Sequence, residues 1–133
     1  MFVVRTTLGP SSIHGIGAFA GEPIRKGQVV WQFDPRLDLR FSLSDLAKFP
    51  PAVQEHIVTR CYVEMYLGEK MMVICSDNAQ YVNHSADPNL IDSEDGLVEH
   101  AARDIAVGEE LTCNYYISDL AVNEKLGESI VEA

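Results

Sequence analysis

The apolar segments of this chain are short, and residues that favour turns separate them. Residues 29–33, 62–67 and 71–75 are typical segments, and prolines at Pro10 and Pro23 interrupt the N-terminal part of the chain. Strands commonly span 4–8 residues, whereas a membrane-spanning helix needs about 20 consecutive apolar residues. The pattern predicts a mostly β protein with short strands and no membrane span.

Turn residues and β-rich composition divide the chain into expected strands. Strands are expected at residues 2–6, 29–33, 62–67, 71–75, 97–101 and 110–115, with the segments at 62–67 and 71–75 forming a hairpin. Residues 8–12 are expected to turn, and the polar residues 81–89 are expected to form an ordered loop.

Helical signals are concentrated in the middle of the chain. Ser42 or Ser44 can cap a short helix over residues 45–48. Pro51 suits the first turn of a second helix, and apolar residues at near-helical spacing predict that it continues to about Arg60. A weak helical pattern follows at residues 119–131.

Composition is that of one globular domain, expected over residues 1–133, with 47% apolar and 23% charged residues. The N-terminus lacks the pattern of a secretory signal, so a cytoplasmic location is expected. Ten Lys and Arg against 20 Asp and Glu give a net charge of −10. This charge opposes direct nucleic-acid binding; it either favours basic partners or only maintains solubility.

The cysteines and histidines do not form the patterns of a metal site. Cys61, Cys75 and Cys113 are widely spaced and form no C-x-x-C pair, and the histidines lack i, i+4 spacing. No bound metal is expected.

A glycine-rich block near the N-terminus has two possible explanations. Gly15-Ile16-Gly17-Ala18-Phe19-Ala20 matches a dinucleotide-binding fingerprint, but a Gly-Pro-Ser-Ser sequence precedes it and Pro23 follows it, which excludes the required strand-to-helix context. The glycines then indicate either a tight turn or close approach of a ligand to the backbone.

Two later blocks are equally ambiguous when each is taken alone. Asn83-His84-Ser85-x-x-Pro88-Asn89 fits Asx turns around a buried histidine, and Tyr115 at the end of Gly108-Glu109-Glu110-Leu111-Thr112-x-x-Tyr115 fits a half-buried strand tyrosine. Their order and spacing, together with the glycine block and Ile24-x-x-Gly27, are hard to obtain by chance.

In this order the blocks resemble the signature of the SET-domain protein lysine methyltransferases, over about residues 13–116. The chain is similar in size to minimal catalytic cores without flanking zinc modules, with residues 117–133 as a C-terminal tail. The resemblance implies a mostly β SET (β-clip) fold of small curved sheets with one or two short helices. It also implies a pseudoknot-like crossing of the C-terminal segment with the Asn83 loop.

The resemblance further implies S-adenosylmethionine as cofactor and a protein lysine as methyl acceptor. The implied cofactor-binding residues are His14, Gly15, Ile16, Gly17, Asn83 and His84. Tyr115 matches the family's catalytic tyrosine, whose hydroxyl lies beside the path of methyl transfer. Because free lysine has a pKa of about 10.4, forming its neutral amine at pH 7 costs about 4–5 kcal/mol, which a desolvated channel beside a sulfonium charge would reduce.

The substrate channel implied by the resemblance is formed by Phe33, Tyr62 and Tyr81. Phe33 stands where many relatives carry a channel tyrosine, whereas Tyr62 and Tyr81 either line the channel or pack in the core. The expected partner is a lysine-containing, basic protein, and the chain is expected to be a monomer or a homodimer. The alternative function is a catalytically silent SET-fold module that binds a basic protein.

Overall fold

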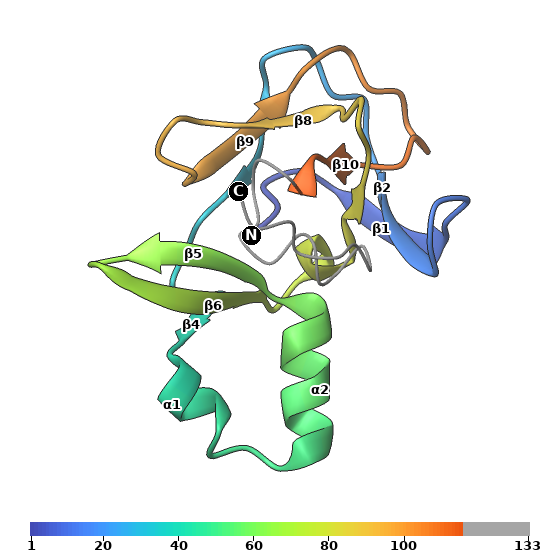
Figure 1. Cartoon of the computed structure of the whole chain (residues 1–133). Helices are drawn as coiled ribbons and strands as arrows, with labels where there is room; N and C mark the ends of the chain where they lie inside the picture. Colours follow the sequence, from blue (N-terminus) through green and yellow to red (C-terminus); the bar gives the residue numbers. More distant parts are fainter. Residues whose placement is uncertain (116–133) are drawn as a thin grey trace.

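A computed structural model gives the structure of residues 1–115 of the chain. Within this range the polypeptide consists mainly of short strands in two- and three-stranded sheets (Figure 1). The strands are β1 (Thr6–Pro10), β2 (Ile16–Ala20), β3 (Val29–Gln32), β4 (Asp38–Phe41), β5 (Tyr62–Tyr66), β6 (Glu69–Cys75), β7 (Asn83–His84), β8 (Leu90–Asp92), β9 (Val98–Ala101) and β10 (Thr112–Cys113). The helices are α1 (Leu43–Leu46), α2 (Pro51–Arg60) and the 3-10 helix η1 (Asn78–Tyr81). The mostly β fold predicted from the sequence is therefore confirmed.

Within residues 1–115 each strand pairs with only one or two neighbours, so the sheets are small. β1 pairs with β2, β9 lies between β3 and β8, and β6 lies between β4 and β5, all antiparallel. β7 and β10 form a parallel pair, with Asn83 opposite Thr112 and His84 opposite Cys113. This last pairing joins two segments that are distant in sequence, and both belong to motif blocks.

Two separate apolar clusters hold these elements together. The larger one joins β2, β3, β8 and β9 through Ala20, Ile24, Val30, Leu90, Ala101, Ile105 and Leu111. The smaller one, Ile57, Cys61 and Met72, packs α2 against β6. Burying an aliphatic side chain of this size contributes roughly 1.5–3 kcal/mol. Figure 1 shows the result as two parts: α1, α2 and β4–β6 below, and the remaining sheets above.

The local pattern predicted both helices. Ser42 caps α1 by accepting a hydrogen bond from the Asp45 amide while the Asp45 carboxylate accepts one from the Ser42 amide. α1 begins two residues before the predicted range of 45–48. α2 spans the predicted residues, and Pro51 at its start needs no hydrogen-bond donor there. The hairpin of β5 and β6 is confirmed as well.

The first strand was predicted in the wrong place. Residues 2–5 lie outside it, with Phe2 in an isolated bridge to Trp31; β1 begins at Thr6 and covers part of the predicted turn. Gly9 and Pro10 are tolerated because β1 pairs only with β2, so a proline at its end removes no necessary donor. The Phe19 ring also lies over Gly9, 3.6 Å from where a Cβ would be.

Other differences arise where pairing depends on distant residues. β2, β4 and β8 were not predicted, β10 is shorter than the strand expected at 110–115, and β7 lies inside the expected loop. The helix predicted at 119–131 and the C-terminal part of the predicted crossing lie outside the described residues. Within residues 1–115, no helix combines the length and apolar character needed to cross a membrane.

Candidate active site

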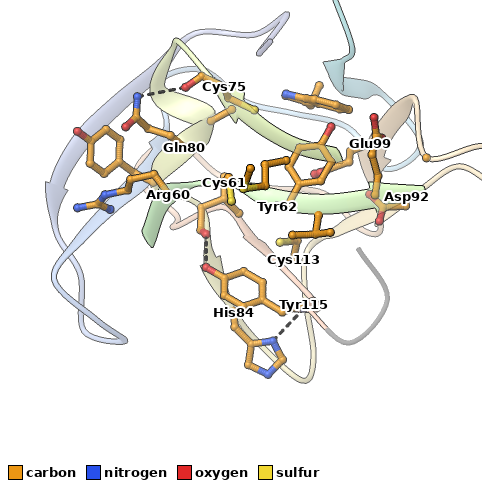
Figure 2. A pocket seen from close by; sticks show the side chains of 18 of the residues that line it. Arg60, Cys61, Tyr62, Cys75, Gln80, His84, Asp92, Glu99, Cys113 and Tyr115 are labelled. Carbon is orange, nitrogen blue, oxygen red and sulfur yellow. Dashed lines mark hydrogen bonds between the residues drawn. The ribbon is translucent and has the colours of Figure 1, made fainter. Parts of the chain in front are cut away.

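A cavity of about 1450 Å³ opens between the two parts of the fold. Most of the site residues predicted from sequence line it: His14, Gly15, Ile16, Tyr62, Tyr81, Asn83, His84 and Tyr115. Gly17 and Phe33 are not among its lining residues. Figure 2 shows Tyr115 and His84 in one part of this pocket, Asp92 and Glu99 in another, and Tyr62 and Cys113 between them in this view.

The pairing of β7 with β10 brings two motif blocks to the cavity. Asn89, which is buried in the adjoining loop, stabilises the pairing of β7 with β10. Its side-chain oxygen accepts a hydrogen bond from the Thr112 amide, and its side-chain nitrogen donates one to the Glu110 carbonyl oxygen, both at 2.8 Å. Asn89 therefore fixes the backbone that leads to Tyr115.

Tyr115 is held at both its backbone and its hydroxyl group. Its amide donates to Nδ1 of His84 at 3.1 Å, and its hydroxyl donates to the Val82 carbonyl oxygen at 2.7 Å. The two rings lie with centroids 5.3 Å apart. Because the hydroxyl proton is directed at Val82, the hydroxyl oxygen can serve a ligand only as a hydrogen-bond acceptor.

Asn83 joins β7 to the glycine loop, which we define as residues 11–17. Its side-chain nitrogen lies 3.0 Å from the His14 carbonyl oxygen, 3.3 Å from that of Ile16 and 2.9 Å from Oε2 of Glu110. The loop backbone at the cavity is therefore attached to the same strand that carries His84.

The two glycines of the loop have different roles in the structure. Gly15 has a φ of +49°, a left-handed conformation that side chains disfavour. Gly17 provides space instead, because a Cβ there would lie 2.5 Å from Oε2 of Glu110. This contact explains Gly17 without a ligand, and Gly17 stays outside the cavity lining.

The aromatic residues predicted for the channel separate into two groups. Tyr62 lines the cavity beside Trp31, with ring centroids 6.4 Å apart, and the Arg60 guanidinium lies 4.6 Å from the ring centroid of Tyr81. The Tyr62 hydroxyl is buried and has no hydrogen-bond partner within residues 1–115, and burial raises the Tyr62 pKa above its usual range.

Phe33 is placed differently from the expectation of a channel residue. The Arg40 guanidinium lies 4.0 Å from the centroids of both Phe33 and Tyr66, and its Nε is 2.6 Å from Oε1 of Glu64. Phe33 thus joins β3 to the β4–β6 sheet through Arg40. The Arg40 cation lies over the face of its ring, and the Trp31 ring packs against it with centroids 6.4 Å apart.

Two acidic residues in the cavity wall were not predicted. Asp92 and Glu99 are opposite each other on β8 and β9, and both line the cavity. Burial, with the Asp92 charge as a second cause, raises the pKa of Glu99 to about 8, and burial also raises the pKa of Asp92. No local sequence signal marks this pair, because the pairing of the strands creates it. Glu110, unlike this pair, lies within one of the motif blocks, although no function was predicted for it from the sequence.

The comparisons with known proteins agree with this arrangement. A model of the SET domain matches residues 15–116. The histone-lysine N-methyltransferase ATX2 of Arabidopsis thaliana is 29% identical over 136 residues, which cover 92% of this chain and 12% of that protein. The chain therefore spans only a small part of this relative.

Solved structures show the same fold. A chain of the Chaetomium thermophilum Polycomb Repressive Complex 2, in an autoinhibited conformation bound to S-adenosylmethionine, has a TM-score of 0.65 at 23% identity, covering 93% of this chain and 16% of that one. A humanized mutant of that complex bound to the inhibitor GSK126 has the same TM-score at 24% identity, over 91% of this chain and 16% of the other. Since the family match covers most of the sequence and the fold agrees, the chain belongs to the SET domain family.

Proposed function

We propose that this chain transfers a methyl group from S-adenosylmethionine to the ε-amine of a lysine in a protein. The observation that carries the proposal is the meeting of three motif blocks in one cavity. The glycine loop, Asn83 with His84, and Tyr115 come from distant parts of the sequence and line the same space. The name of the Arabidopsis relative and the ligand of the Chaetomium structure support the same reaction and cofactor.

The residues of the cavity fit the chemistry of this cofactor. Its amino-acid part needs both hydrogen-bond donors and acceptors, which loop backbone groups at His14 and Ile16 and the side chains of Asn83 and His84 can supply. S-adenosylmethionine, when bound, supplies an electrophilic methyl group on a positively charged sulfur.

Tyr115 orients the lysine nitrogen in this proposal. An acceptor oxygen attracts an ammonium or amine N–H, and the bond to Val82 fixes the direction of that oxygen. Correct alignment of reacting atoms can contribute several kcal/mol without covalent catalysis. Apolar and aromatic cavity residues such as Tyr62 lower the lysine pKa by desolvation, so that the neutral amine forms more easily.

The charge of the cavity wall supports a basic protein as substrate. Its acidic residues are Glu64, Asp92, Glu94, Asp95 and Glu99, of which Glu99 contributes little charge at neutral pH because its pKa is raised to about 8, and its Arg and Lys residues are Arg60 and Lys70. The chain as a whole carries a net charge of −10. Such a field accelerates association with a cationic partner and weakens as salt is added.

A transfer assay tests the proposed function. The purified chain is incubated with radiolabelled S-adenosylmethionine and a fraction of basic cellular proteins, and labelled residues are identified by mass spectrometry. We expect label on lysine, and a rate that rises between pH 7 and 9 and falls with added salt. Binding of the cofactor without label on any protein would favour the alternative, a silent binding module; absence of cofactor binding would refute both the activity and the cofactor.

A further inference from the structure

The carboxylate of Glu110 is a meeting point of segments that are far apart in the chain. The Ser11 hydroxyl lies 2.8 Å from Oε1 and 2.9 Å from Oε2 of Glu110, and the Asn83 side-chain nitrogen lies 2.9 Å from Oε2. The backbone beside it is also fixed, since the Leu111 amide donates to the Ala18 carbonyl oxygen at 2.8 Å. Glu110 therefore presents an anchored, charged acceptor to the glycine loop.

Ser11 passes this anchoring to the part of the loop that lines the cavity. Its hydroxyl oxygen accepts hydrogen bonds from the amides of Ile13 at 2.9 Å and His14 at 3.2 Å, and its own amide donates to the Gly15 carbonyl oxygen at 2.8 Å. Because this oxygen receives two donors, its proton is available for Glu110. The loop thus closes around Ser11, and Ser11 is oriented by the carboxylate.

Asn83 holds the loop from the other side through the same carboxylate. Its nitrogen contacts the carbonyl oxygens of His14 and Ile16 as well as Oε2 of Glu110. Gly17 makes the arrangement sterically possible, because any side chain there would displace the Glu110 carboxylate. Hydrogen bonds to a charged partner are the stronger ones, so the carboxylate contributes more than a neutral amide would.

The geometry points to Glu110 as a positioning residue for the cofactor: through Ser11 and Asn83 it holds His14, Gly15 and Ile16 in the backbone conformation that the cofactor binds. This inference rests on the proposed function. Glu110 acts through the loop and not by direct contact with the cofactor. The simpler alternative is that the carboxylate stabilises the fold as a whole without a particular effect on ligand binding.

Glu110→Gln separates these possibilities, with Glu109→Gln as the matched control. Glutamine keeps the shape but turns an N–H group toward one of the existing donors, Ser11 or Asn83. The Glu109 side chain is exposed, so its variant removes one charge next to the same site without touching the loop. We expect Glu110→Gln to weaken S-adenosylmethionine binding about tenfold in calorimetry, on the scale of one lost hydrogen bond to a charged group. Glu109→Gln should stay within twofold of wild type.

Three further measurements identify positioning as the cause. With saturating S-adenosylmethionine, Glu110→Gln should recover a kcat within threefold of wild type, because the loss is in binding and not in transfer. Ser11→Ala should weaken cofactor binding similarly, and the double variant should lose clearly less than the product of the two single effects, since both break one network. In the protein without ligand, the amides of Ile13 and His14 should exchange with solvent at least about tenfold faster in Glu110→Gln.

The outcomes distinguish this inference from the proposed function. Faster exchange of the loop amides with unchanged cofactor affinity would overturn the positioning role. Unchanged exchange would overturn the anchoring itself. If wild type does not bind S-adenosylmethionine, the proposed function fails and the role of Glu110 toward the cofactor fails with it, while the exchange measurement still decides whether the carboxylate anchors the loop.

Discussion

The glycine loop and the segment from β4 to β6 both line the cavity, but different interactions hold them in place. Around the loop, buried or half-buried polar groups of Asn83, Asn89 and Glu110 form a connected set of hydrogen bonds. The β4–β6 segment depends on a small apolar cluster around Ile57, and its hairpin exposes Leu67 at 87%. Hydrogen-bond networks fix the orientation of the groups that they join, whereas small apolar clusters tolerate substitutions by side chains of similar volume. The polar network therefore fixes the positions of the site residues, whereas the apolar cluster needs only side chains that fill the same volume.

Among the changes that test this comparison, Asn89→Ala should cause the largest loss of stability. The change leaves the buried Thr112 amide and Glu110 carbonyl oxygen without their partner, at a cost of about 3 kcal/mol in the free energy of unfolding. Urea denaturation measures this loss in the free energy of unfolding. Leu67→Asn, on the exposed hairpin at a φ of +50° that asparagine tolerates, should change the stability by less than about 0.5 kcal/mol. Similar losses for the two variants would refute the contrast between the regions.

A second effect on stability, dependent on pH, is expected from Glu99. Its pKa rises from an ordinary 4.5 to about 8 in the folded protein, so the folded state binds more protons than the unfolded chain between these values. Stability should therefore fall as pH rises through this range, and Glu99→Gln should flatten the profile. Thermal unfolding of both proteins at several pH values tests this. A wild-type profile as flat as that of the variant would show that Glu99 titrates normally.

The smallest effect on stability is expected from Tyr62→Phe. The hydroxyl is buried without a partner within residues 1–115, so removing it should leave the protein equally stable or up to about 1 kcal/mol more stable. If the hydroxyl receives a hydrogen bond from the substrate, KM for the protein substrate should rise several-fold. A clear loss of stability would show instead that Tyr62 is a structural residue.

Local signals in the sequence predicted local structure well. Helix α2 was predictable because Pro51 and the spacing of the apolar residues act within one segment. The motif blocks likewise indicated that Asn83, His84 and Tyr115 belong together. Their contacts were out of reach, because the short β7–β10 pair depends on residues about thirty positions apart.

Long-range contacts also explain where the structure differs from the expectations drawn from the sequence. The strand at β1 was misplaced because Gly9 and Pro10 signal a turn locally, although an edge strand accepts them. Phe33 was expected in the channel from its place in the motif, but Arg40, on another strand, covers its ring. The acidic pair Asp92 and Glu99 is created by strand register alone. The order of residue types along the chain does not show which distant residues will come into contact in this way.

The most direct test of the proposed activity is to measure cofactor binding and methyl transfer together in wild type and Tyr115→Phe. Because the hydroxyl orients the lysine nitrogen and not the cofactor, the variant should bind S-adenosylmethionine within about threefold of wild type. Its transfer rate should fall about 100-fold or more, as when an oriented polar group is removed from an active site. Normal transfer by Tyr115→Phe, with label appearing on lysine at the wild-type rate, would contradict the role of this cavity in catalysis.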